Sequence, residues 1–384
     1  MFTNLREFVT SMPDEKSCRE YLALQRWPDG KITCPYCGNP KSYVIEGGER
    51  YKCANNKCYK RFTVTVGTVM EASNIPVSKW LMAFYLVTAH KKGISSYQLG
   101  RDLGIAQKNS WFMLHRIREA LRNKANVKLD NVVEVDEVYI GGKVPNMSKS
   151  KRKKLREDGN TYNTKTMVMG MIERGGELKL ITVAPGNVPT MQKTIRENVG
   201  ANADVITDNH LGYYNLKNEH SSHEVVKHSA FEYVREGNIH TNSIEGAFSL
   251  LKRSIIGIYH QVTPKHLPRY CDETMYRYNL RKMKDNDRFT FTLTKVEGRL
   301  KYRDLVATPE PVKLTPITTG EKPKLGRIGF GVSKPVYQLF DGEIVNRFES
   351  INQAAELTGI KAIKITKVLR GYLATTNGYQ WSYA

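Results

Sequence analysis

Alternating apolar and polar residues predict three consecutive strands in the middle of the chain. These strands cover residues 132–141, 166–173 and 177–184, and the glycine pairs Gly141-Gly142 and Gly175-Gly176 end the first two of them. Such alternation is typical of strands whose side chains point in turn to the two faces of a sheet. The middle of the chain is therefore expected to begin with a run of three strands.

The pattern after these strands predicts helices and strands in turn. We expect a helix over about 190–199, a strand over 204–207, a short helix near 213–219, a strand over 223–228 and a long helix from about 242. The complete order is β-β-β-α-β-α-β-α, which is the order of the ribonuclease-H-like core. In that core the first strand, the end of the fourth strand and the last helix meet at one edge of the sheet.

Three acidic residues occupy those three places. Asp136 lies in the first strand, Asp208 at the end of the fourth strand, and Glu245 near the start of the last helix. Two divalent ions held by carboxylates can bind both the attacking and the leaving oxygen of a displacement at phosphorus. Hard cations such as Mg²⁺ prefer oxygen ligands of this kind. The positions therefore indicate a phosphoryl-transfer site that uses Mg²⁺ or Mn²⁺.

Two of these acids have structural alternatives. Glu245 could bond back to a helix cap at Asn242, because the pattern Asn-x-x-Glu matches a capping box. Asp208 could be a turn or cap residue in the segment TDNHLGY. Neither alternative is decided by the sequence alone.

Asp136 is harder to explain structurally, because a carboxylate in a largely buried strand requires a partner or a metal ion. Strand alternation places Glu134 on the same face as Asp136 and Glu137 on the opposite face. Glu134 is therefore the reserve candidate for a metal ligand.

Four cysteines near the N-terminus form two pairs: Cys34-x-x-Cys37 and Cys53-x₄-Cys58. Four thiolates about one hairpin apart make a closed, structural Zn²⁺ site, and such a site would stabilise a ribbon that is too small for a core of its own. Two disulfides are the alternative. No signal peptide precedes the pairs, so we expect a cytoplasmic, DNA-associated protein that is not secreted.

Between the cysteines and the first strand, apolar periodicity predicts helices over 77–90 and on both sides of Gly104, which resemble a helix-turn-helix. A recognition helix would present the polar residues near its start to the major groove. The polar residues of the last predicted helix are Lys108, Asn109, His115, Arg116 and Arg118. A plain helical bundle that links two domains is the alternative.

The charge balance favours a polyanionic partner. Lys and Arg number 59 against 38 Asp and Glu, so the formal net charge is +21 and the pI is about 9.6. Such a surplus attracts phosphates, although charge alone does not separate DNA from RNA or an anionic membrane. No apolar run reaches the roughly 18 residues of a membrane span, so no membrane role is expected. The basic run 149–156 (KSKRKKLR) is expected to be an exposed loop that also contacts DNA.

At this point the residues resemble a known family. The blocks VDEVYIGGK, TDNHLGYY, HSAFEYV and HTNSIEGAFSLLKR are similar to those of bacterial insertion-sequence transposases of the DDE class, in the subgroup with an N-terminal zinc ribbon. The resemblance covers roughly residues 15–305. It implies that Asp136, Asp208 and Glu245 form the catalytic triad, that double-stranded DNA from element ends and target is the substrate, and that a dimer or larger assembly acts on it.

The same resemblance assigns secondary roles around the last helix. Lys252 lies about two turns after Glu245 and would share its face, with Arg253 next to it on the DNA side. His240 and Asn242 match the HTN block and would orient water or DNA. A solvated lysine is the alternative for Lys252.

Beyond a linker rich in proline, glycine and lysine at 306–335, the chain ends in a small unit over 336–384. A hairpin with Asp341-Gly342 at its turn, two helices and a closing strand are expected there. This unit resembles the NUMOD-type DNA-binding module of some homing endonucleases. The resemblance implies a set of phosphate-facing residues: Ser350, Lys361, Lys364, Lys367 and Arg370. A solubilising or protein-binding tail is the alternative.

Together these features predict a multi-domain α/β protein. The expected segments are a zinc ribbon with an N-terminal helix (1–70), a helix-turn-helix region (71–127), a ribonuclease-H-like catalytic domain (128–305), the linker (306–335) and a small α+β DNA-binding module (336–384). The expected function is a DNA transposase that needs Mg²⁺ or Mn²⁺ and Zn²⁺. A non-catalytic DNA-binding regulator and a stand-alone nuclease of the same fold, such as a junction resolvase, are the alternatives.

Overall fold

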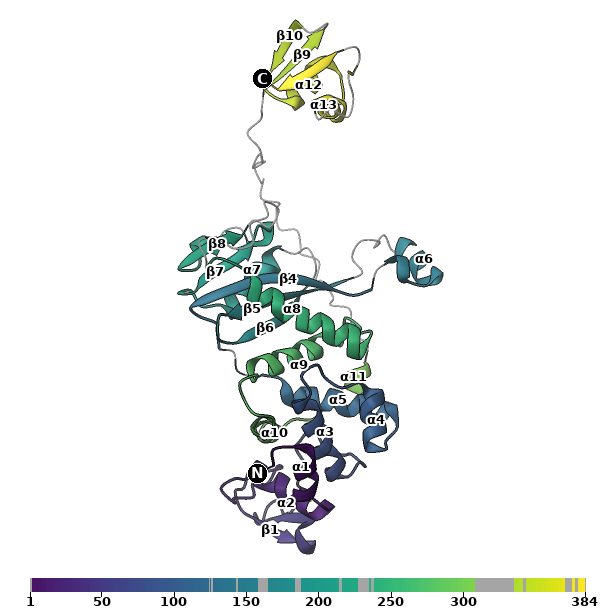
Figure 1. The fold of residues 1–384 in the computed structure, drawn as a ribbon, viewed down its shortest axis with the longest axis vertical. Helices are drawn as coiled ribbons and strands as arrows, with labels where there is room; N and C mark the ends of the chain where they lie inside the picture. Colours follow the sequence, from purple (N-terminus) through teal and green to yellow (C-terminus); the bar gives the residue numbers. More distant parts are fainter. Residues whose placement is uncertain are drawn as a thin grey trace. The chain divides into compact units, whose positions relative to one another are not determined.

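The structure of the chain is a computed structural model, which separates into two compact units, residues 1–309 and 310–384 (Figure 1). The residues that the structure describes are 2–123, 125, 127–142, 144–157, 165–183, 188–213, 216–226, 235, 238–307, 335–340, 343–369, 375–376 and 379–383.

The first unit begins with two helices beside a small antiparallel sheet. Their bounds are α1 (Leu5–Ser11), α2 (Glu15–Arg26), β1 (Ser42–Ile45), β2 (Arg50–Cys53) and β3 (Arg61–Phe62), and the sheet order is β1-β2-β3. Asp14 and Ser17 form a capping box at the start of α2. The rings of Trp27 and Phe62 both lie against Tyr51, with centroids 5.2 and 5.6 Å from it, and so join α2 to the sheet.

Three helices follow, and all three lie where the sequence predicts helices. They are α3 (Val77–Ala89), α4 (Ser96–Leu103) and α5 (Gln107–Leu121). Gly104 ends α4 in the left-handed conformation (φ +57°, ψ +48°), which glycine adopts without a steric penalty. The turn predicted at this glycine is therefore present.

The hydrophobic core of this first part is continuous with residues much later in the chain. Phe289 and Leu293 of α10 (Asp285–Leu293) are fully buried in the same cluster as Trp80 and Phe84 of α3. The predicted segments 1–70 and 71–127 thus share one core with the end of the predicted segment 128–305. α9 (Leu267–Asn279) connects this core to the central sheet, and α11 (Tyr302–Val306) lies at the end of the unit.

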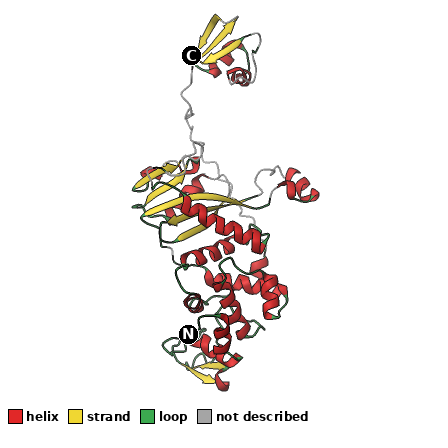
Figure 2. Ribbon diagram, viewed as in Figure 1, coloured by secondary structure: helices red, strands yellow, loops and turns green. Residues whose placement is uncertain are grey.

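The central sheet has five strands in the order β6-β5-β4-β7-β8, shown in yellow among red helices in Figure 2. The strands are β4 (Val132–Ile140), β5 (Thr166–Glu173), β6 (Leu178–Val183), β7 (Asp204–Asp208) and β8 (Ser222–Val226). β4 is antiparallel to β5 and parallel to β7, which is parallel to β8. All five strands predicted for this region are confirmed, to within two residues at each end.

Helices cover both faces of this sheet. Met191 and Ile195 of α7 (Val188–Asn198) pack with Val133 and Val135 on one face. On the other face, α8 (Asn242–Ser254) and α9 pack with Val138 and Ile140 of β4, in the arrangement that Figure 1 shows. The alternation along β4 therefore assigns even-numbered residues to the α8 face and odd-numbered residues to the α7 face.

Two predicted elements differ from the structure. The basic run predicted as a loop forms the helix α6 (Lys149–Glu157), because lysine, arginine and glutamate are all good helix formers. The short helix expected near 213–219 is instead a pair of 3₁₀ turns, Leu211–Tyr213 and Leu216–Asn218. The block HSAFEYV, at 228–234, lies outside the described residues.

The second unit contains a three-stranded antiparallel sheet and two helices. Its elements are β9 (Val336–Phe340), β10 (Glu343–Phe348), α12 (Ile351–Thr358), α13 (Ala362–Leu369) and β11 (Gln380–Tyr383), with the strand order β10-β9-β11. Val336, Ile365 and Trp381 form the centre of its own core. The strands and helices expected here are present, while Asp341 and Gly342 lie outside the described residues.

Candidate functional site

A group of three carboxylates lies where β4 passes the end of β7. Ligand oxygens of Asp136, Glu137 and Asp208 all lie within 4.8 Å of one another. Asp208 is the last residue of β7, and the preceding Thr207 pairs with Val135 of β4. The structure thus brings together the two strand acids predicted from the sequence. It adds Glu137, which alternation places on the opposite face from Asp136.

The end of β7 lies level with this part of β4, because Asp208 follows Thr207, the partner of Val135. Ligand oxygens of both Asp136 and Glu137 lie near Asp208 at this point. Alternation assigns the two side chains to opposite faces and carries no information on the distance between their carboxylates, which is why the sequence did not identify Glu137.

Asp136 has a raised affinity for protons in this group. Burial, together with the negative charges of Glu137, Asp208 and Glu245, raises the pKa of Asp136 to about 7. A hydrogen bond from the backbone N–H of Glu137 to Asp136 Oδ1 (2.7 Å) acts in the opposite direction. A half-buried group of like charges is stabilised either by protons or by a cation. Its oxygen-only ligands fit a hard divalent ion.

The segment after β7 holds Glu137 in place. The hydroxyl of Tyr213 donates a hydrogen bond to Glu137, and His210 Nε2 lies 4.0 Å from Glu137 Oε1. Burial and the charge of Glu137 raise the pKa of Tyr213 well above its ordinary value, so the tyrosine remains a hydrogen-bond donor. The block TDNHLGYY therefore supplies both Asp208 and the support for Glu137. The second role could not be predicted from the sequence, because Tyr213 fell in a predicted helix.

Glu245 lies on α8 outside the closest group, but its charge reaches Asp136. The capping-box alternative for this residue is wrong. The cap residue of α8 is Thr241, not Asn242, and the Thr241 side chain accepts no capping hydrogen bond from a backbone N–H of the helix. The hydroxyl of Thr241 lies 3.4 Å from Glu245 Oε1 and donates to it.

Glu134 is on the same face as Asp136, as alternation predicts, but it is not placed to be a metal ligand. Its side chain is fully buried, and its carboxylate accepts hydrogen bonds from Arg174 and from the start of α8. The reserve assignment of Glu134 as a ligand is therefore corrected. Its oxygens are occupied within the protein.

The remaining residues predicted near α8 have different surroundings. His240 contacts Arg174, with Nδ1 3.1 Å from the guanidinium Nη2, so it is part of a protein network. Asn242, Lys252 and Arg253 are exposed. Lys252 remains about two helical turns from Glu245 on α8, where it is free to meet a ligand that approaches the acids.

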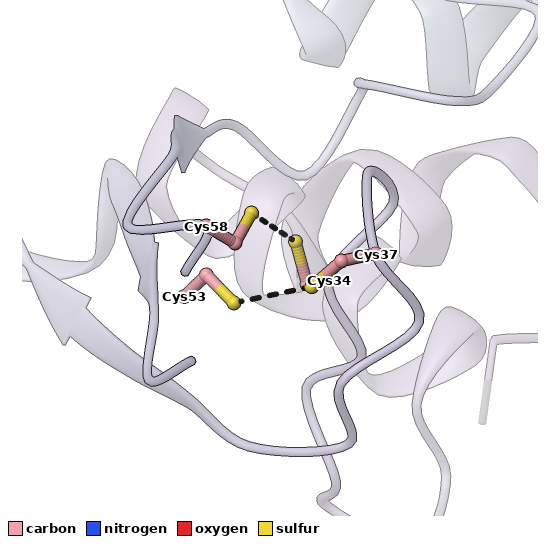
Figure 3. Close-up of side chains that lie close together, drawn as sticks. All are labelled: Cys34, Cys37, Cys53 and Cys58. Atoms are coloured by element: carbon pink, nitrogen blue, oxygen red, sulfur yellow. Dashed lines mark hydrogen bonds between the residues drawn. The ribbon is translucent and has the colours of Figure 1, made fainter. Parts of the chain in front are cut away.

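The four cysteines form a second site in the N-terminal sheet region (Figure 3). All four Sγ atoms lie within 4.8 Å of one another, with 3.9 Å between Cys34 and Cys58 and 3.5 Å between Cys37 and Cys53. A tetrahedron with Zn–S bonds of 2.3 Å has edges of about 3.8 Å. The sulfurs are therefore spaced for one Zn²⁺. None of these cysteines is in a disulfide, so the disulfide alternative is excluded.

Two of the five residues predicted to contact DNA from the helical region are exposed. Lys108 and Asn109 lie at the start of α5, and Lys108 Nζ is 5.4 Å from the ring centroid of Tyr302. These positions leave both side chains open to a ligand.

The other three residues are buried, so the prediction that they face DNA is wrong for this structure. Arg118 is 2% exposed and pairs with Glu273 at 2.7 Å. Arg116 lies over the Trp80 ring at 5.2 Å. His115 is fully buried, and burial with nearby positive charges lowers its pKa to about 2. The long arginine side chains satisfy buried carboxylates and rings, a role that a residue-type pattern does not separate from phosphate binding.

In the second unit, all three lysines predicted to face phosphate are exposed: Lys361, Lys364 and Lys367. Ser350 instead caps α12, because its hydroxyl accepts from Gln353 N at 3.0 Å. This correction removes Ser350 from the phosphate-facing set, while Arg370 lies outside the described residues.

Three segments of the chain match known families. Residues 13–61 match the transposase zinc-ribbon domain, residues 128–279 the ISXO2-like transposase domain, and residues 341–381 the NUMOD-like domain of I-HmuI-like DNA endonucleases. The four cysteines lie in the first segment and the acids in the second. The resemblance to zinc-ribbon insertion-sequence transposases and to a NUMOD-type module is thereby confirmed, and the chain is a multi-domain α/β protein.

A protein from a transposable element and a viral integration complex are similar to longer stretches of the chain. The chain is 27% identical, over 256 residues, to a protein in the transposable element ISH50 of Halobacterium salinarum. The aligned region covers 64% of this chain and 84% of that protein. A structure of the simian T-cell lymphotropic virus intasome with PP2A regulatory subunit B56 gamma is 10% identical, covering 70% of this chain and 86% of that chain. Its TM-score is 0.20, which is too low to support a structural argument.

Among the described helices, none is both long enough and apolar enough to cross a membrane.

Proposed function

We propose that this protein is a DNA transposase that cuts the ends of its element and joins the freed 3′-OH to target DNA. The observation that carries the proposal is the carboxylate group at the end of β7, within the segment that matches a transposase domain. The sheet order β6-β5-β4-β7-β8, with α8 across the face that carries Asp136, supports a ribonuclease-H-like core. Asp136, Asp208 and Glu245 are the proposed catalytic acids.

These residues would hold two divalent ions, Mg²⁺ or Mn²⁺. Asp136 and Asp208 come from adjacent parallel strands, Glu245 from α8, and Glu137 offers a further oxygen to the same space. When bound, the ions would lower the pKa of water and neutralise charge on both oxygens of an in-line displacement. The raised pKa of Asp136 fits this assignment, because the site favours added positive charge.

Two displacements at phosphorus make up the reaction. In the first, a water oxygen forms a bond to the phosphorus at the element end, the bond from phosphorus to the 3′ oxygen breaks, and that oxygen leaves as a 3′-OH. In the second, this 3′ oxygen attacks a target phosphodiester, whose own 3′ oxygen leaves. No covalent bond to the protein forms at either step, so the side chains bind and orient the DNA.

Several basic surfaces would hold that DNA. We propose Lys108 and Asn109 at the start of α5, which would act as the recognition helix of a helix-turn-helix, and Lys252 and Arg253 beside Glu245. α6 carries basic residues on nearly every turn and is mostly exposed, so it is a further candidate. Phosphate contacts of this kind give affinity without sequence readout.

The second unit is proposed as an additional DNA-binding module. Its exposed lysines lie on and next to α13, within the segment that matches a NUMOD-like domain. Because two element ends must be joined, we also propose that a dimer or larger assembly forms on DNA.

The test uses purified zinc-loaded protein, Mg²⁺ or Mn²⁺, and labelled DNA from the inverted repeats beside its own gene. Wild type is compared with Asp208→Asn and with the matched control Asp204→Asn, at the exposed opposite end of the same strand. We expect cut and joined products from wild type and from the control, and neither from Asp208→Asn.

The alternatives predict other results. Cutting without joining by wild type would favour a stand-alone nuclease. Specific DNA binding by all three proteins without any cutting would favour a non-catalytic regulator.

A further inference from the structure

The start of helix α8 is capped by a carboxylate from the central sheet. Glu134 of β4 accepts hydrogen bonds from the backbone N–H groups of Ser243 (2.8 Å) and Ile244 (3.1 Å), and from the Ser243 hydroxyl (2.9 Å). These are the second and third residues of the helix, whose N–H groups a cap side chain ordinarily satisfies. The cap residue itself, Thr241, makes no such bond, so a residue more than a hundred positions earlier replaces it.

Arg174 completes the charge balance of this buried carboxylate. Its Nε donates to Glu134 Oε1 at 2.7 Å. Its other nitrogens donate to the backbone carbonyls of Asn238 (2.6 Å) and His240 (2.9 Å), so one guanidinium fixes both the cap and the segment that leads into α8. A buried carboxylate is stable only when it is paired and hydrogen-bonded in this way.

A glycine brings the same helix close to the acid-bearing strand. Gly170 of β5 pairs directly with Asp136. A Cβ atom at this position would lie 2.5 Å from Ile244 Cδ1 and 2.6 Å from a ring carbon of Phe248, which is a clash. The close approach of α8 therefore occurs beside Asp136.

The capped residues are the immediate neighbours of a proposed catalytic acid. Ile244, whose N–H bonds to Glu134, precedes Glu245, while Glu134 lies two residues before Asp136 on the same strand face. One carboxylate thus connects the strand that carries one acid to the helix turn that carries another. We infer that Glu134 and Arg174 are positioning residues, which fix Glu245 relative to Asp136 so that both can hold the same metal pair. This inference rests on the proposed function.

The experiment measures Mn²⁺ binding and DNA cutting separately, with the full-length, zinc-loaded protein. Bound Mn²⁺ is determined from the loss of the free-ion spectroscopic signal, and cleavage rates are measured against Mn²⁺ concentration. The variants are Glu134→Gln, which keeps the size but weakens the cap, and the milder Ser243→Ala, which removes one hydrogen bond. Glu273→Gln is the matched control, because Glu273 is an equally buried partner of an arginine, Arg118, away from the acids. Thermal unfolding is recorded for each protein.

Substitution of a residue that orients a metal ligand typically lowers metal affinity or activity by about 10–100-fold. We expect Glu134→Gln to weaken Mn²⁺ binding at the acid site by about tenfold or more, Ser243→Ala to weaken it less, and Glu273→Gln to leave it unchanged even if it unfolds at a lower temperature. DNA affinity without metal should stay at the wild-type value in all three.

Three outcomes are distinguishable. Weaker Mn²⁺ binding in Glu134→Gln or Ser243→Ala, but not in Glu273→Gln, supports the inference. Equal Mn²⁺ binding in wild type and both cap variants overturns it and leaves the proposed function intact. If wild type itself neither binds Mn²⁺ nor cuts DNA, the proposed function fails and the inference fails with it.

Discussion

The zinc site and the acid site differ in how much of the chain each draws together. The four cysteines lie within residues 34–58, in and beside one small sheet. The acids come from residues 136 to 245, on two strands and a helix. A local site depends on turn geometry, whereas a long-range site depends on the register and ends of every element around it. Loss of a zinc ligand should therefore unfold the chain only near the zinc site. The acid site should instead lose metal binding when any of its supporting elements is displaced slightly.

Removal of the zinc ligand Cys37 should have the largest effect. Structural zinc contributes about 10–16 kcal/mol of apparent binding free energy in small zinc domains, and this energy is also folding energy. We expect Cys37→Ser to lose its zinc and to expose the region before about residue 70 to protease, while the central sheet, which has separate cores, resists cleavage. Zinc analysis and limited proteolysis measure the two effects.

Cys18→Ser is the matched control, since Cys18 is buried outside the metal group. It should keep one zinc per chain. Equal loss of the central sheet in Cys37→Ser would contradict the local character of the site.

The next largest effect distinguishes Glu245 from Glu137 as the third acid. Loss of a ligand that supports several kcal/mol of transition-state stabilisation costs on the order of 10³-fold in rate. We expect this loss for Glu245→Gln. Glu137→Gln should cost about 10–100-fold, because Tyr213 shares that carboxylate. Cleavage rates at saturating Mn²⁺ provide the measurement.

Glu197→Gln, an exposed position on α7, should cut at the wild-type rate. If Glu137→Gln is the more damaged of the two acid variants, the assignment of the third acid passes from Glu245 to Glu137.

The same contrast explains what could be predicted from sequence. Strands β4 to β8 follow from apolar alternation, and the cysteine group follows from spacing, because both signals are local. The proximity of Asp136 and Asp208 could be predicted, because strand order alone determines which strand ends meet. Glu137 was missed because alternation places it on the face opposite Asp136, although its carboxylate lies close to that of Asp136. Glu134 was misassigned because its partners lie on a helix far along the chain.

The helix α5 shows a further limit. Its residue types alone do not reveal that Arg116 and Arg118 turn inward, because the acceptors, the carbonyl of Glu71 and the carboxylate of Glu273, come from other elements. Burial of an arginine depends on tertiary partners, and those partners have no fixed spacing in the sequence.

A smaller effect is expected from pH. The pKa of Asp136 is raised from 3.8 to about 7, so the folded state holds its proton more tightly than the unfolded state does. This contribution to stability is complete below about pH 4 and is lost as the pH rises through 7, and it amounts to at most a few kcal/mol. Without Mg²⁺, wild type should lose stability relative to Asp136→Asn over that range. With saturating Mn²⁺ this pH dependence should disappear, because the ion takes the place of the proton on Asp136.

Because proton and ion compete for the same carboxylate, the affinity for Mn²⁺ should itself rise up to tenfold from pH 6 to 7.

Unfolding temperatures of zinc-loaded protein, measured at several pH values, test this prediction. Asp272, whose pKa burial raises to about 6, is present in both proteins and cancels in the comparison. Parallel pH profiles for wild type and Asp136→Asn would contradict it.

The smallest expected effect concerns the exposed start of α5. Each phosphate contact lowers the slope of log affinity against log salt by about 0.9. Lys108→Gln should therefore weaken DNA binding a few-fold at moderate salt and make that slope less negative by about one, because Lys108 is exposed and has no carboxylate partner among the described ion pairs. Lys193→Gln, an exposed lysine of α7 that pairs with Glu197, is the control and should change neither. Binding isotherms at several salt concentrations provide the measurement. If the two variants have the same slope as wild type, the start of α5 does not meet phosphate, and exposure is then no better a guide to DNA contact in this helix than residue type.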